Sequence, residues 1–305
     1  MRNEIDNYLA YCKNQKGLNT KTTQAYSIDL NQFEIYLNDY NLVMDKKGIE
    51  NYLSYLHKNY KQKTVKRKIA SLKAFFNYLE FEEKININPM HKIRSKFKEE
   101  ITLPRFISRE NIELLLAYLY QVDCKTEFQK KKNARDIAIV ELLFATGIRI
   151  SELCNIKISD MDLNEGILRI RGKGAKERII QIANYDVLNS LKKYYNLNHE
   201  TIVKKEYFFI NKQGNVLSDQ SARNMLKKHA ENAGIKQNVT PHLFRHAFAT
   251  FLLEEDVDIR YIQKMLGHSS ISTTQIYIEV ASEKQKQILK TKHPRNKMNP
   301  LNRDN

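Results

Sequence analysis

The sequence predicts a mainly α-helical protein with a small β-hairpin or sheet in its second part, an α+β fold of two domains. Three observations carry this prediction. The chain has 305 residues, which is more than one domain usually holds. Apolar residues recur at helical spacing through much of the chain. One stretch, residues 167–182, changes to β-prone residues interrupted by glycines.

The first eighty residues have the pattern of helices. Apolar residues share one face in two segments: Tyr26, Leu30, Phe33 and Leu37, then Val65, Ile69, Leu72, Phe76 and Leu79. Four basic residues of the second segment fall largely outside its apolar stripe: Lys63, Lys66, Arg67 and Lys73. This basic side is either a solvated helix face or a DNA-contacting one, and the segment alone favours neither.

A linker is expected at residues 86–106, between a helical domain at 1–85 and a second domain at 107–305. The linker loses the helical periodicity, is densely charged and contains Pro89 and Pro104. In the second domain, Ser108 is suited to cap a helix. A second helix ends at Gly147, and residues 123–134 between the two helices are expected to form a polar loop.

A β-hairpin is expected next. Residues 167–171 and 178–182 are β-prone, and Gly172 and Gly174 between them favour a turn. The chain then returns to helices.

The last helices have recognisable ends. Pro241 follows Thr240 as the first residue of one helix. Gly267 ends another, which starts near Asp258, and a capping-box pattern at residues 272–275 opens the final segment.

Composition bounds the function. Lys and Arg number 51 against 35 Asp and Glu, a net charge of +16, which suits a nucleic-acid partner or, more simply, a basic solvated surface. Three cysteines cannot all pair and lack metal-ligand spacing, so we expect a reducing cytoplasm and no structural zinc. No apolar run is long enough to span a membrane, and the N-terminus does not resemble a signal peptide.

His242 and Arg245 stand three residues apart on an expected helix, so their side chains project from the same side. Together they offer a charged fork and a directional N–H, which suit a phosphoryl oxygen. For an isolated pair, polar residues facing solvent are the more ordinary explanation.

Each of the other candidate residues also has an ordinary explanation. His268 directly follows Gly267, where a histidine commonly interacts with the helix dipole. Tyr277 has the pattern of a packed amphipathic side chain. Arg149 is suited to pair with Glu152 three residues later, and Lys173 lies at a hairpin turn, where exposed lysine is common.

Taken in order, these residues carry a resemblance. The segments ATGIRISEL, GKGAKER, TPHLFRHAFAT, LGHSS and IYI resemble the successive catalytic boxes of the tyrosine recombinase (phage integrase) family, with spacing like the Xer type. The N-terminal helices resemble that family's core-binding domain, so the similarity covers nearly the whole chain. Each box is a weak signal alone, and the ordered set is a strong one.

The resemblance implies a site-specific DNA recombinase that works through a covalent 3′-phosphotyrosine bond at Tyr277. Arg149 and Arg245 would clamp the scissile phosphate while His268 supplies a further donor. His242 would assist proton movement, and Lys173, with Lys176 as its rival, would protonate the departing 5′ oxygen. Glu152 would orient its neighbours. The family requires neither a metal nor a cofactor.

The implied partner is double-stranded DNA at a specific, partly palindromic site. A synaptic tetramer is expected, either of this chain alone or with a second recombinase, and residues 282–295 would dock onto a neighbouring protomer. The biological role is dimer resolution or integration and excision of a mobile element. The sequence leaves two alternatives open: a DNA-binding regulator that does not cut, and a relaxing enzyme like type IB topoisomerases.

Two positions depart from the family pattern. Phe244 stands where the family usually has leucine, and Asp256 where a helix commonly ends in glycine. Neither position belongs to the reacting groups, and Asp tolerates a left-handed backbone better than most residues.

Overall fold

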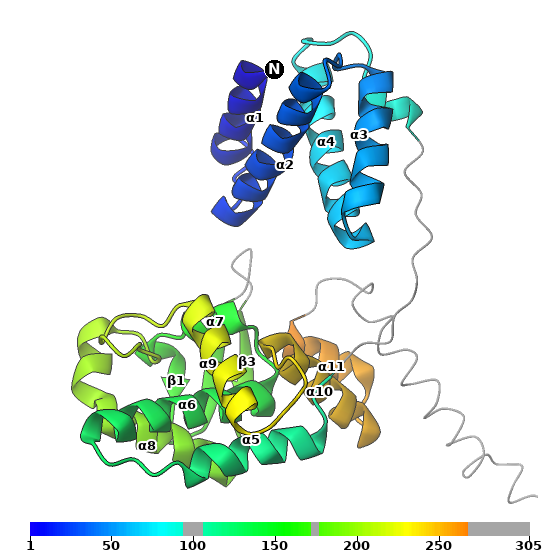
Figure 1. Ribbon diagram of the computed structural model, residues 1–305. Helices are drawn as coiled ribbons and strands as arrows, with labels where there is room; N and C mark the ends of the chain where they lie inside the picture. Colours follow the sequence, from blue (N-terminus) through cyan, green and yellow to red (C-terminus); the bar gives the residue numbers. More distant parts are fainter. Residues whose placement is uncertain (94–105, 172–176, 268–305) are drawn as a thin grey trace, which may run out of the picture. The chain divides into compact units, whose positions relative to one another are not determined.

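The computed structural model describes residues 1–93, 106–171 and 177–267. The chain divides into two compact units, Met1–Glu100 and Ile101–Asn305, and each is described by itself (Figure 1). The described residues are mostly helical and include one small antiparallel sheet, so the predicted mainly α fold is confirmed.

The described part of the first unit, residues 1–93, consists of four helices and a short 3-10 turn. They are α1 (Arg2–Asn14), α2 (Thr20–Asp39), α3 (Lys46–Asn59), α4 (Gln62–Phe81) and η1 (Pro89–Lys92). The predicted stripe of α4 is buried throughout, and on α2 only Tyr26 stays partly exposed. Met90 of η1 is also buried in this core, so part of the stretch expected as linker packs with the first unit.

The second unit contains the remaining elements. They are α5 (Arg109–Gln121), α6 (Glu127–Thr146), α7 (Ile150–Cys154), η2 (Ile158–Asp160), β1 (Met161–Asp162), β2 (Ile167–Arg171), β3 (Glu177–Gln181), α8 (Tyr185–Lys205), α9 (Asp219–Asn232), α10 (Pro241–Glu254) and α11 (Ile259–Leu266). Helix α6 is central: residues 134–143 are all buried, and it packs against α5, α8 and α10.

A buried charge cluster ties α6 to α9. Arg135 donates to Asp136 Oδ1 at 2.7 and 3.0 Å, and His229 Nε2 lies 2.8 Å from Asp136 Oδ2. Burial alone would raise the pKa of Asp136, but His229 and Arg135 hold it below its ordinary value. The carboxylate is therefore charged and paired inside the core, as a buried charge must be.

The sheet is antiparallel in the order β1-β2-β3. Strands β2 and β3 form the predicted hairpin, with Arg171 opposite Glu177 at its end. Leu168 and Ile180 pair across the strands and are buried, whereas Arg169 points to solvent, which is the alternation of a sheet covered on one face.

Local signals fixed several helix ends correctly. The Ser108 side chain accepts a hydrogen bond from the backbone of Asn111, and Asp258 is the N-cap of α11. Gly147 and Gly267 adopt left-handed φ values of 58° and 64° after α6 and α11. A Cβ atom on Gly147 would lie 2.7 Å from the Phe248 ring, so space as well as backbone conformation requires glycine there.

The expected polar loop at residues 123–134 is wrong over most of its length. Helix α6 begins at Glu127, because Thr126 and Gln129 form a capping box at its N-terminus. The lysines that follow belong to a turn of this helix rather than to a loop. Their charge reflects the exposure of that turn rather than the absence of a helix.

No helix within the described ranges is long and apolar enough to cross a membrane. None of the three cysteines forms a disulfide bond: Cys12 and Cys154 are buried, and Cys124 is partly exposed.

Candidate active site

Arg149 lies at the junction where α6 ends and α7 begins. Gly147 turns the chain, and Arg149 is the N-cap of α7. Its backbone N–H donates to Glu152 Oε2 at 2.9 Å, and its guanidinium donates to Glu152 Oε1 at 2.8 Å. Glu152 therefore caps α7 and holds the Arg149 side chain, as the three-residue spacing predicts.

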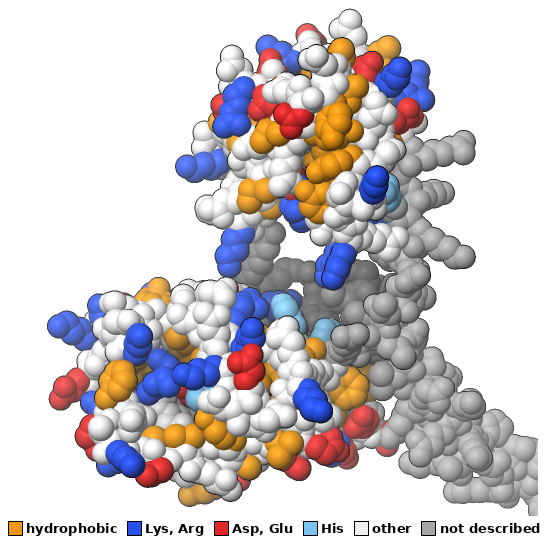
Figure 2. Space-filling model, in the orientation of Figure 1, with side chains coloured by type: hydrophobic (Ala, Val, Ile, Leu, Met, Phe, Trp, Pro, Cys, Tyr) orange, Lys and Arg blue, Asp and Glu red, His pale blue; other side chains and the backbone are white. Residues whose placement is uncertain are grey.

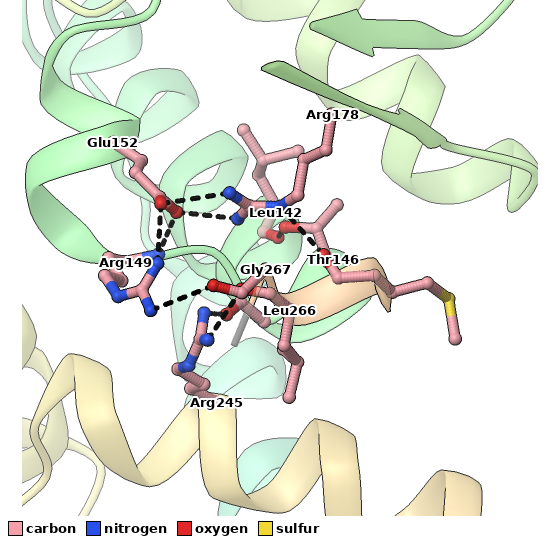
Figure 3. Close-up of polar contacts among 10 residues, drawn as sticks. Leu142, Thr146, Arg149, Glu152, Arg178, Arg245, Leu266 and Gly267 are labelled. Carbon is pink, nitrogen blue, oxygen red and sulfur yellow. Dashed lines mark hydrogen bonds and ion pairs between the residues drawn. The ribbon is translucent and has the colours of Figure 1, made fainter. Parts of the chain in front are cut away.

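Glu152 has a second cationic partner, Arg178 on β3. The Arg178 guanidinium donates to both carboxylate oxygens, at 3.1 and 2.8 Å. Burial alone would raise the pKa of Glu152, but hydrogen bonds from Arg178 and Arg149 hold it below its ordinary value. The carboxylate is therefore ionised and fixed between two arginines (Figure 3).

Arg245 reaches the same place from α10. It is only 6% exposed, and its guanidinium donates to the carbonyl oxygens of Gly147 at 2.9 Å and Leu266 at 2.7 Å. Arg149 makes a longer contact of 3.5 Å to the next carbonyl, that of Gly267. The two predicted phosphate-binding arginines thus meet at the C-terminal end of α11, where the helix dipole is negative (Figure 3).

His242 is exposed one helical turn before Arg245 on α10. In the view of Figure 2, Lys, Arg and His side chains gather on part of the surface of the second unit. The predicted residues Lys173, His268 and Tyr277, together with Lys176, lie outside the described residues. Gly267, which precedes His268, is the C-cap of α11 and is described.

Sequence reasoning overlooked His246, which directly follows Arg245. Its side chain is partly buried, and burial, followed by the nearby His242 and Arg245, lowers its pKa. The neutral imidazole is therefore favoured in the folded protein. Its position beside Arg245 in the motif was the signal available in the sequence.

This lowered pKa predicts a pH dependence of stability. Folding disfavours protonation of His246. The contribution of His246 to the free energy of unfolding is therefore complete above the pKa of the unfolded state, about 6.5, and it declines as the pH falls toward the lower pKa of the folded state. We expect the free energy of unfolding of the wild type relative to His246→Gln to be larger at pH 7.5 than at pH 5.5. Denaturant unfolding of both proteins at the two pH values measures this stability difference. A difference that is the same at both pH values would contradict a lowered pKa of His246.

The predicted DNA-contact residues lie on the face of α4 that points away from the core. Lys63, Arg67 and Lys73 are exposed, and Lys66 is partly exposed. Arg67 is not simply solvated, because it forms an ion pair with the buried Asp29 of α2.

A fifth cation, Lys68, was overlooked. It is 2% exposed and lies 3.1 Å from Asp29, which also accepts a hydrogen bond from Ser71 at 2.8 Å. Lys68 stands three residues after Val65, so it falls on the core-facing side of the helix. Burial of a lysine there depends on a carboxylate from another helix, which periodicity alone cannot reveal.

Comparisons with known proteins show the family to which the chain belongs. Residues 105–284 match the phage integrase family, and residues 5–83 match the phage integrase N-terminal SAM-like domain. A tyrosine recombinase of Agathobacter rectalis is 52% identical and covers 97% of both chains. Tyrosine recombinase XerD of Listeria innocua is 34% identical over 97% of this chain and 100% of its own. These relatives favour a recombinase over the regulator and topoisomerase alternatives.

Solved structures show the same fold. A XerH recombinase bound to a palindromic difH substrate matches with a TM-score of 0.75 at 22% identity, over 94% of this chain and 84% of that one. A lambda integrase dimer bound to a core site matches with a TM-score of 0.69 at 19% identity, over 88% and 95% of the two chains. From the family match and the recombinase relatives, the chain belongs to the phage integrase family and is a tyrosine-type site-specific DNA recombinase.

Proposed function

We propose that this recombinase cuts and rejoins DNA through a covalent bond between Tyr277 and a 3′ phosphate, with Arg149 and Arg245 binding the scissile phosphate. The observation that carries the proposal is the convergence of the two arginines on adjacent carbonyls at the end of α11. Negative charge accumulates on the non-bridging oxygens during attack at phosphorus, and preorganised cations stabilise it.

The proton movements follow from ordinary side-chain chemistry. The phenol of Tyr277, with an unperturbed pKa of about 10, must lose its proton as its oxygen bonds to phosphorus. His242 assists this step, and His268 donates a hydrogen bond to the phosphate. The bond from phosphorus to the 5′ oxygen breaks, and that oxygen takes a proton from Lys173, or from its neighbour Lys176. A 5′ hydroxyl reverses the attack, so rejoining needs no ATP.

The partner is double-stranded DNA, bound jointly by a core-binding domain at residues 1–85 and a catalytic domain at 107–305, with a linker between them. Lys63, Lys66, Arg67 and Lys73 contact phosphates, so affinity falls with salt. Related structures support the palindromic target and the tetramer: XerH is bound to a palindromic substrate, and lambda integrase forms a tetramer on a Holliday junction.

By analogy, the target is partly palindromic and the active assembly is a synaptic tetramer, either of this chain or with a second recombinase. Residues 282–295 dock on the neighbouring protomer. The substrate, whether a chromosome or plasmid dimer to be resolved or a mobile element to be moved, places the reaction in the cytoplasm.

The proposal predicts a specific adduct. The protein is isolated from its native host under denaturing conditions, the attached DNA is sequenced, and a second portion is digested with nuclease and trypsin. Trypsin releases residues 265–284, in which Tyr277 is the only tyrosine. We expect a nucleotide on this peptide and DNA enriched at one short, partly palindromic site. An adduct on another tyrosine would overturn the assignment of Tyr277, and no adduct would contradict cleavage.

A further inference from the structure

We infer that Arg178 is a positioning residue for DNA cleavage: it clamps Glu152 to the end of α11 and thereby fixes Arg149 where the scissile phosphate binds. This inference rests on the proposed function, which assigns Arg149 to the phosphate. Arg178 itself belongs to β3, a different part of the chain from α7 and α11, and it was not among the residues expected to act in catalysis.

All three nitrogens of the Arg178 guanidinium donate hydrogen bonds. The Nε–H donates to the carbonyl of Met265 at 2.8 Å, and the two terminal nitrogens donate to the two oxygens of Glu152 at 3.1 and 2.8 Å (Figure 3). Only 13% of the side chain is exposed. Each guanidinium nitrogen donates within the protein, so Arg178 joins Glu152 to the backbone of α11.

The same two oxygens of Glu152 hold Arg149. Oε1 accepts from the Arg149 guanidinium at 2.8 Å, and Oε2 accepts from the Arg149 backbone N–H at 2.9 Å. Glu152 is 8% exposed, so few water molecules can replace a lost partner. Without Arg178, the Glu152 carboxylate would pair with Arg149 alone. It would then draw the Arg149 guanidinium away from the position of the phosphate.

Arg178 also contacts the C-terminal end of α11. A Cβ atom built on Gly267 would lie 3.0 Å from an Arg178 nitrogen, so the arginine packs directly against the helix C-cap. Arg245 and Arg149 contact the carbonyls of Leu266 and Gly267 on this turn. Arg178 therefore supports the turn to which both phosphate-binding arginines are fixed.

Lysine cannot replace this arginine. A guanidinium presents five N–H donors in a rigid fork that matches a carboxylate, whereas a lysine ammonium is a single point charge on a flexible stem. A lysine at 178 would keep the charge but lose either the two-point contact to Glu152 or the bond to Met265. Arg178→Lys therefore distinguishes the geometry of the guanidinium from its charge.

The test compares two substrates in single-turnover cleavage, using the DNA site recovered from the covalent adduct. One substrate has an ordinary scissile phosphodiester, and the other has a methylphosphonate there, which removes the negative charge that Arg149 neutralises. We expect Arg178→Ala to lower phosphodiester cleavage by about 100-fold, the cost of misplacing a catalytic group by about 1 Å. On the methylphosphonate, both Arg178→Ala and the reference Arg149→Ala should lose only a few-fold.

Further variants complete the test. Arg178→Lys should stay close to Arg178→Ala, and Arg169→Ala, an exposed arginine on the adjacent strand β2, should cleave both substrates like the wild type. In a Glu152→Ala background, Arg178→Ala should add little, because residues that act as a unit are not additive. Circular dichroism checks folding, and Arg178→Gln replaces Arg178→Ala if the latter unfolds.

Several outcomes would overturn the inference. Equal losses on the two substrates would show a general structural role, and full activity of Arg178→Lys would show that charge alone matters. Additive effects with Glu152→Ala would show that Arg178 does not act through that carboxylate. A wild type that cleaves neither substrate would contradict the proposed function as well, whereas an active wild type with an equally active Arg178→Ala would contradict this inference alone.

Discussion

Replacing Tyr277 by phenylalanine is expected to abolish covalent attachment to DNA and to lower strand cleavage by at least about 10⁴-fold, the scale on which loss of a catalytic nucleophile acts. Phenylalanine keeps the aromatic ring and removes only the phenolic oxygen that would bond to phosphorus. Packing and DNA affinity should therefore change little. Denaturing gels of protein incubated with its labelled target site measure attachment, and electrophoretic mobility shifts measure binding.

The matched control is Tyr261→Phe. Tyr261 lies on α11, close to Tyr277 in the sequence, and is 67% exposed. The substitution removes the same phenolic oxygen from a tyrosine that takes no part in the proposed reaction. It should form the adduct at the wild-type rate. Attachment that persists in Tyr277→Phe would exclude Tyr277 as the nucleophile, and loss of DNA binding in that variant would point to a structural effect.

Arg245→Lys is expected to lower cleavage by about 10²- to 10³-fold, comparable to removing one preorganised donor from a transition-state site. The buried guanidinium bonds to two carbonyls that belong to different segments, Gly147 and Leu266. A lysine cannot hold both and direct a charge at the phosphate. One buried carbonyl would lose its partner, so we also expect a loss of about 1–3 kcal/mol in the free energy of unfolding.

Arg109→Lys is the control for this second prediction. Arg109 is 52% exposed and pairs with Glu254 and Glu255 at 3.4 Å, so the same substitution should cost less than about 1 kcal/mol and leave the cleavage rate unchanged. Single-turnover kinetics and denaturant unfolding measure both quantities. Cleavage by Arg245→Lys within a few-fold of the wild type would contradict a phosphate-binding role for Arg245.

Two of the overlooked residues, Arg178 and Lys68, share a cause, because each depends on a partner far away in the sequence. Nothing near Arg178 in the sequence indicates that it shares Glu152 with Arg149, since 26 residues separate Arg178 from that carboxylate. Lys68 follows the same rule, because its burial depends on Asp29, which lies 39 residues away on another helix. The start of α6 is a different case: the capping box of Thr126 is a local signal in the sequence, but the charged lysines after it favour a polar loop when they are considered alone.

The sequence by itself determined the features that depend on near neighbours. Helical periodicity predicted the buried stripe of α4, and glycines with no Cβ predicted the left-handed ends of α6 and α11. β-Prone residues around a turn predicted the hairpin of β2 and β3. The ordered motifs also predicted the family.

Only the tertiary structure decided how the charged groups combine. It placed Arg149 and Arg245 on adjacent carbonyls of one helix end, and it gave Glu152 a second arginine from the sheet. The physical reason is that a buried ion pair depends on which side chains packing brings within about 3 Å of each other, and packing joins segments far apart in the chain. Local sequence sets each helix and strand, but the contacts between them set the charge arrangement of the site.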